Sequence, residues 1–146
     1  MVLEWPLDVA GQFFLEVFCG DAVFTMGVML AKIPCICPWD VKYGEQFDVL
    51  QHGPVLLALA EAHRISSAHL GTPCQSLTWC RLPVLRTWQH IQGRPSLLQR
   101  EQELVSNGNE LVLFTGTFIL ALYKVAYIKQ RLIFSGKSCT YLVLGH

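Results

Sequence analysis

The chain has 146 residues, of which 52% are hydrophobic and 15% are charged, against about 25% charged in an average soluble domain. These proportions exclude a disordered tail, a charged coiled coil and a collagen-like fibre, and the length suits one domain with a core. Eleven basic residues balance eleven acidic ones, yet residues 1–63 carry a net charge of −6 and residues 64–146 a net charge of +6. An acidic half followed by a basic half indicates either two differently charged ligands or two differently charged faces.

The N-terminus and the cysteines bear on the compartment. Glu4 stands where a signal peptide requires positive charge, so we expect an intracellular protein of the nucleus or cytoplasm with reduced thiols. Cys35 and Cys37 form a CxC pair, and no second pair stands at zinc-finger spacing, so we expect no metal site. Most of the six cysteines are expected to be small buried hydrophobes.

Strands and helices are expected to alternate along the chain. The apolar runs predict strands over 13–18, 33–37, 65–70 and 131–134. Helices are predicted from Asp21 to Lys32, from Pro54 to His63, and from a capping box at Ser96 and Gln99 onward. Residues 71–95 show no periodicity and form a long loop of the kind that is usually functional. This alternation predicts an α/β fold with a doubly wound, Rossmann-like parallel sheet.

The apolar stretch 111–123 contains thirteen uncharged residues, whereas a membrane span needs about 20. Leu104, Leu111, Phe118 and Val125 recur every seven residues, which is typical of one helix face. We therefore expect a buried core helix and no membrane span. A small membrane-associated protein built on residues 111–128 is the alternative.

Three features follow three predicted strands: Phe18-Cys-Gly20, Asp40, and Thr72-Pro-Cys-Gln75. Ligands of parallel sheets bind beyond the carboxyl ends of the strands, where a glycine turn admits a ligand and an acid holds ribose hydroxyls. The chain has no GxGxxG, so a dinucleotide fingerprint is absent. The plain alternatives are a tight turn at Gly20 and a solvated loop acid at Asp40. Ser135-Gly-Lys-Ser138 lacks the upstream glycine of a phosphate loop.

Cys74 differs from the other cysteines in its surroundings. Pro73 and Gln75 flank it, and no acid occurs between residues 62 and 100. Neighbouring positive charge lowers the pKa of a thiol, and arginines interleaved with tryptophans bind phosphates and stack on bases. The alternative is a structural cysteine in a solvated loop. The arginines in question are Arg81, Arg86, Arg94 and Arg100.

Four segments in order resemble cytosine-5 DNA methyltransferases and their uncharacterised relatives. They are Phe13-Phe-Leu-Glu-Val-Phe-Cys-Gly20, Pro38-Trp-Asp40, Phe47-Asp-Val-Leu50 and His69-Leu-Gly-Thr-Pro-Cys-Gln-Ser-Leu-Thr78. The resemblance implies a sheet that binds S-adenosylmethionine, with Phe18 and Gly20 at the adenosine and methionine parts, Glu16 near polar groups and Asp40 at the ribose. It also implies that Cys74, between Pro73 and Gln75, attacks C6 of a flipped cytosine so that C5 accepts the methyl group.

The resemblance covers residues 12–135, between an extension (1–11) and a divergent tail (136–146). Asp21-Ala22 replaces a second glycine of the family, and the expected fourth strand does not lead into Glu-Asn. We therefore expect a truncated, DNA-binding methyltransferase-like protein that is inactive alone unless a second chain completes the domain. The alternative is a non-catalytic nucleic-acid or protein interaction fragment on a Rossmann-like sheet.

Overall fold

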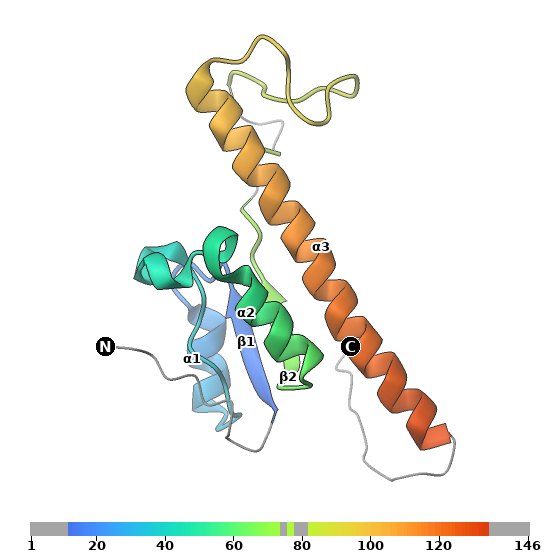
Figure 1. Ribbon diagram of the computed structural model, residues 1–146. Coiled ribbons are helices and arrows are strands. Elements are labelled where there is room, and N and C mark those ends of the chain that lie inside the picture. Colours follow the sequence, from blue (N-terminus) through green and yellow to red (C-terminus); the bar gives the residue numbers. More distant parts are fainter. Residues whose placement is uncertain (1–11, 74–75, 78–81, 135–146) are drawn as a thin grey trace.

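The computed structural model describes residues 12–73, 76–77 and 82–134, with side chains described up to residue 126. The fold is mixed α/β and contains a small parallel sheet of β1 (Phe13–Val17) and β2 (Ile65–Leu70). Between them lie α1 (Val23–Leu30), the short 3-10 turns η1 (Val41–Tyr43) and η2 (Glu45–Phe47), and α2 (Val49–Glu61). The long helix α3 (Gln99–Phe134) follows, and Figure 1 shows it running along α2 and beyond it.

β1 is a buried strand between β2 and residues 34–39, as its apolar sequence predicts. Leu15, Glu16 and Val17 are all buried, which requires cover on both faces of the strand. One edge pairs with β2. The other edge meets residues 34–39 only at the isolated bridges Phe14–Cys35 and Val17–Trp39. The predicted strand over 33–37 is thus reduced to two bridges, because Pro34 and Pro38 have no N–H for a continuous ladder.

The first two helices begin differently from the sequence prediction. Asp21 does not cap α1: the N-cap is Ala22, at φ 53°, and its own side chain makes no capping hydrogen bond. The second helix begins at Val49, five residues before Pro54, because Asp48 Oδ1 accepts the Leu50 N–H at 2.9 Å and caps the helix there.

α3 has 36 residues, which corresponds to a length of about 54 Å. The side chain that satisfies a backbone group at its start is Glu101 rather than Ser96 or Gln99: Glu101 Oε2 accepts the Leu98 N–H at 3.0 Å. The prediction of a strand over 131–134 was wrong, since these residues continue α3. No glycine or proline occurs between Gly116 and residue 134 to end the helix.

The expectation that α3 is buried was also wrong. Only 6% of its most apolar 18-residue window is buried, although Phe118 and Ala121 enter the core. Among the described residues, Gln99–Ala126 is the one helix whose length and composition would allow it to cross a membrane. A core helix of a soluble protein passes the same test, so this is weak evidence for a span.

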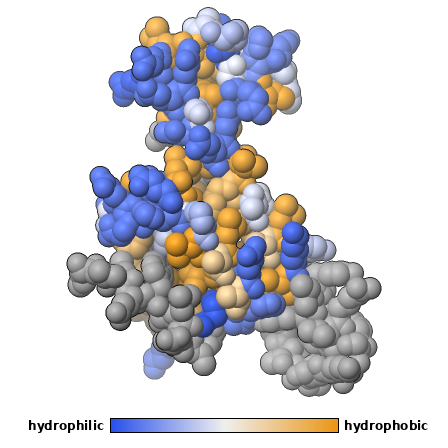
Figure 2. Space-filling view, in the orientation of Figure 1, coloured by the Kyte–Doolittle hydropathy of each residue, from blue (hydrophilic) through white to orange (hydrophobic). Residues whose placement is uncertain are grey.

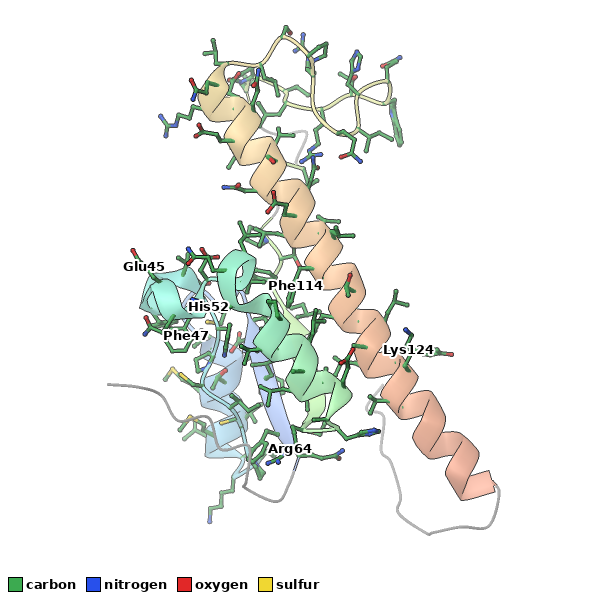
Figure 3. All side chains as sticks on the ribbon, in the orientation of Figure 1. Glu45, Phe47, His52, Arg64, Phe114 and Lys124 are labelled. Atoms are coloured by element: carbon green, nitrogen blue, oxygen red, sulfur yellow. The ribbon has the colours of Figure 1, made fainter. Side chains whose placement is uncertain are left out.

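The core lies where α2 and α3 pack over the sheet. Leu15, Leu56, Trp39 and Phe118 are almost fully buried there. Gly53 permits the close approach of the two helices, because a Cβ on it would lie 2.8 Å from the Phe114 ring. Figure 3 shows Phe114 between α3 and α2. In the described residues, this packing supports a two-stranded α/β unit compatible with a Rossmann-like start, and the predicted four-stranded sheet does not form.

Candidate functional site

Three chain segments meet at the carboxyl edge of the sheet, as the sequence predicts. The Phe18 N–H donates to the Trp39 carbonyl at 2.7 Å, and the Gly71 N–H donates to the Val17 carbonyl at 3.0 Å. A Cβ at Gly71 would lie 2.7 Å from the Phe18 carbonyl oxygen, so glycine is required for this approach. The turn after β1 and the loop after β2 are therefore in direct contact.

Asp40 connects this turn to the segment beside β1. Its Oδ2 accepts the Gly20 N–H and its Oδ1 accepts the Lys42 N–H, both at 2.9 Å. Tyr43 closes the arrangement, since its hydroxyl donates to the Gly20 carbonyl at 2.8 Å. The sequence reasoning found Gly20 and Asp40 but missed Tyr43, whose only signal is its place one 3-10 turn after Asp40. Together these contacts hold the carboxylate at the mouth of the turn.

Gly20 leaves open space at the same edge. It has φ 53°, and a Cβ built on it would meet no atom within 4 Å. Phe18 is half-buried, and its backbone has φ 57°. The centroid of its ring lies 6.5 Å from that of Phe114, which packs against the core. An aromatic ring, an open glycine turn and a carboxylate thus lie within one short stretch of surface.

The charges of the edge alter several pKa values. Burial, together with the nearby negative charges of Asp40 and Glu16, raises the pKa of the Cys19 thiol from 9.0 to about 11. Burial also raises the pKa of Tyr43. Asp21, which does not cap α1, pairs with Lys42, and this hydrogen bond lowers the pKa of Asp21 and raises that of Lys42. Cys19 is therefore an unreactive thiol near neutral pH.

Glu16 faces the start of α1 rather than solvent. It is 2% exposed, and its Oε2 accepts both the backbone N–H and the hydroxyl of Thr25 at 2.7 Å. Its Oε1 lies 3.5 Å from Nδ1 of His69, whose ring stacks on Phe24 at 4.1 Å between centroids. The carboxylate supplies the anion that a helix N-terminus favours. Because the Glu16 carboxylate is buried, its position gives no support to the prediction that Glu16 binds a cofactor.

The loop of the predicted nucleophile begins beside this edge. Pro73, the third residue after β2, is exposed. The preceding residue contacts α3, since Thr72 Oγ1 lies 2.9 Å from Thr115 Oγ1. Cys74, Gln75 and Arg81 lie outside the described residues, so their predicted roles stay predictions. What the structure places at the edge is the start of their loop.

Arg86 has a different place from the one that the sequence predicted. Its guanidinium donates to the Ser76 carbonyl and hydroxyl, the Ile91 and Val105 carbonyls and Asn109 Oδ1, over 2.6–3.1 Å. All five N–H groups of an arginine are used in such a set. Arg86 therefore joins the loop to α3 and keeps no donor for a phosphate. The sequence gives no local signal of this, since the partners come from three segments.

The other two arginines of the predicted phosphate-binding set that the structure describes are exposed. Arg94 donates weakly to the Val84 carbonyl at 3.4 Å, and Arg100 lies in the first turn of α3. Thr87 and His90 pair as a small antiparallel bridge, and Trp88 between them is 79% exposed. Figure 1 shows this loop at the N-terminal end of α3, away from the sheet.

A groove of about 330 Å³ lies between α2 and α3, at the end of α2 that precedes β2. It is lined by Leu57, Glu61, His63, Thr117, Leu120, Ala121, Lys124 and Val125. None of these residues belongs to the predicted site, which lies at the opposite edge of the sheet. The groove therefore does not contribute to that site.

Among residues 12–73, 76–77 and 82–134, no group of three or more His, Cys, Asp or Glu side chains could hold a metal ion. No family model, no curated protein and no solved structure matches this chain.

Proposed function

We propose that the chain is a cytosine-5 DNA methyltransferase-like protein that keeps the cofactor side of the site and is inactive on its own. The observation that carries the proposal is the Asp40 carboxylate, held 2.9 Å from the Gly20 N–H at the carboxyl edge of parallel strands. Each carboxylate oxygen retains a lone pair that can accept a ribose hydroxyl. Phe18 offers an aromatic face and Gly20 offers open space for S-adenosylmethionine.

Ala22 gives a second line of support. It adopts φ 53°, a left-handed conformation that glycine favours and that costs an alanine about 1 kcal/mol. The resemblance expects a second glycine close to this position. The backbone thus has a glycine conformation where the sequence has alanine, as in a turn derived from a glycine-rich one.

Cofactor binding tests the proposal directly. S-adenosylmethionine or its demethylated product at 100-fold excess over Kd should stabilise the chain by about 2.7 kcal/mol, seen as a higher melting temperature. Asp40→Asn should abolish the shift, because the amide donates where the carboxylate accepts. Asp48→Asn, which alters the cap of α2 and not the edge, is the matched control and should keep the shift. No shift at millimolar ligand would overturn the cofactor claim.

The exposed hairpin favours a second candidate, a nucleic-acid binding fragment without catalysis. Trp88 is 79% exposed between Thr87 and His90, with the exposed Arg94 and Arg100 on the same acid-free stretch. Base stacking on an aromatic side chain contributes about 1–3 kcal/mol. Trp88→Ala should therefore weaken single-stranded DNA binding about tenfold in fluorescence anisotropy, and Arg94→Gln should reduce its salt dependence. If both variants bound single-stranded DNA as tightly as the native chain and with the same salt dependence, this surface would be excluded as the binding site.

A further inference from the structure

α3 has a second apolar face that the core does not use. This outer face consists of Val112, Leu113, Gly116, Ile119, Leu120 and Tyr123. Its large side chains are 44–72% exposed. Figure 2 shows the hydrophobic surface gathered along the middle of the molecule, below a more hydrophilic lobe. A contiguous exposed apolar surface of this kind marks an interaction site.

The outer face lies opposite the face that already packs in the core. At 100° per residue, Gly116 and the fully buried Phe118 are separated by about 200° around the helix. The core therefore covers one side of α3, and the apolar side chains of the outer face stay exposed to solvent. A helix that is apolar on both sides requires cover on both sides.

A lipid bilayer fits this face poorly. The uncharged stretch between Glu110 and Lys124 has thirteen residues and a length of about 20 Å, against about 30 Å for the hydrocarbon core. For α3 to span a membrane, Phe118 and Ala121 would also have to leave their packing in the core.

We propose that the outer face binds a second copy of this chain, with the two α3 helices antiparallel and the two-fold axis at Gly116. In this register Val112 lies beside Ile119 of the other copy, and Leu113 lies beside its Leu120, each pair within about 1.5 Å in level along the helix axis. Gly116 meets its own counterpart at the axis. A Cβ built on Gly116 has no neighbour within 4 Å, so the two backbones can approach closely there.

Charge complementarity selects the second copy and the antiparallel direction. Glu110 and Lys124 are both exposed and lie on the same flank of the outer face. The two-fold axis brings Lys124 of one copy to within about 3 Å, along the helix axis, of the level of Glu110 in the other. The pair occurs twice in the dimer. A parallel pairing would instead leave Glu110 and Lys124 about 21 Å apart along the helix axis.

This inference does not depend on the proposed function, since the outer face is remote from the carboxyl edge. The full native chain should have twice the 16.4 kDa chain mass in light scattering after size-exclusion chromatography. Glu110→Lys and Lys124→Glu should each weaken the dimer about tenfold through like-charge contacts, and the double variant should restore it. Glu103→Lys, the same charge change at an exposed position about 140° around the helix from Gly116, is the control and should leave the dimer intact.

A cysteine cross-link tests the axis. Gly116→Cys should give a disulfide-linked dimer on mild oxidation, because the two sulfurs meet at the axis. Ser106→Cys, exposed on the same helix but ten residues from the axis, should add no cross-link above the native chain. A monomeric native chain, an open-ended assembly, or transfer of the chain to lipid vesicles would each overturn the proposal. Charge reversals that are not rescued by the double variant would overturn it as well.

Discussion

At the scale of single residues, the most constrained group at the candidate site is the Glu16 carboxylate. It is buried and accepts two hydrogen bonds from Thr25. Thr25→Val removes one donor from a buried charge, so we expect the free energy of unfolding to fall by about 1–3 kcal/mol in urea denaturation.

Thr117→Val is the matched control for that change. The Thr117 hydroxyl is exposed and donates to the Leu113 carbonyl of its own helix. Its loss should change the stability by no more than about 0.5 kcal/mol. Equal effects of the two substitutions would show that the Glu16–Thr25 contact contributes nothing specific.

The Cys19 thiol gives a prediction about reactivity. With its pKa raised to about 11, the Cys19 thiol should alkylate about tenfold more slowly near neutral pH in the native chain than in the chain unfolded by urea, because the smaller thiolate fraction outweighs the higher nucleophilicity of each thiolate. Asp40→Asn should accelerate the native reaction, since the Asp40 charge is one cause of the raised pKa. Mass-spectrometric mapping measures each rate. Asp48→Asn should leave the rate unchanged, and a fast native Cys19 would contradict the burial.

The same thiol has a consequence for stability. The pKa of the Cys19 thiol in the folded chain lies above its ordinary value, so folding favours the un-ionised thiol. The contribution of this thiol to the free energy of unfolding is therefore fully present below pH 9 and is lost as the pH rises toward about 11. In urea denaturation the free energy of unfolding of the native chain should therefore fall relative to that of Cys19→Ser over this alkaline range.

At the scale of elements, Arg86 determines how the loop is fixed to α3. Arg86→Lys keeps the charge but cannot supply five donors in a planar fork. We expect amide exchange over residues 82–98 to rise about tenfold or more while β1 and β2 keep their protection. Arg94→Lys, at an exposed arginine with one long hydrogen bond, should leave the exchange unchanged. Exchange that rises in both strands would instead indicate a global role.

The elements that the sequence predicts well are those whose signal is local. β1 follows from a short apolar run between two glycines, and β2 was predicted as a strand at the same bounds. Phe18 and Gly20 follow β1, and Asp40 joins them from the segment that bridges β1 at Trp39. The predicted strand over 33–37 and the end of α3 depend instead on pairing and packing partners that are distant in the sequence. Two prolines interrupt the ladder over 34–39, and nothing after Gly116 ends the helix. Propensity alone does not decide such cases, because pairing partners and packing do.

The same distinction holds for the site residues. Gly20 and Asp40 were recognised because turns and loop acids at strand ends have a general meaning. Arg86 was assigned to phosphate binding because its charge is visible in the sequence, while its acceptors at Ser76, Ile91 and Asn109 are known only once the chain has folded. A buried role for Glu16 likewise depends on Thr25 of the next element.

At the scale of the whole molecule, we expect no turnover from this chain alone. Attack by Cys74 needs a group that stabilises charge on the cytosine ring, and loss of one such group costs about 10²–10³ in rate. The expected glutamate is absent from its place in the sequence. Labelled S-adenosylmethionine should therefore give no labelled DNA, and DNA with 5-fluorocytosine should give no stable adduct.

A Cys74-dependent adduct from the purified chain would contradict that expectation. Cys74→Ser is the control that separates a covalent adduct of the nucleophile from adventitious thiol labelling. Cofactor binding without any adduct would agree with the proposed partial site.

The pairing of Phe13 with Ile65 has a consequence for how the chain acquires its structure. Parallel neighbours that are remote in sequence close a long loop before any pairing energy is gained, which makes such sheets slow to form. During synthesis β1 leaves the ribosome well before its partner, so Leu15 and Val17 remain uncovered until α2 and β2 have followed. Ribosome-bound chains that expose only residues 1–60 should thus be digested readily and retained by chaperones, whereas chains that expose residues 1–126 should resist digestion.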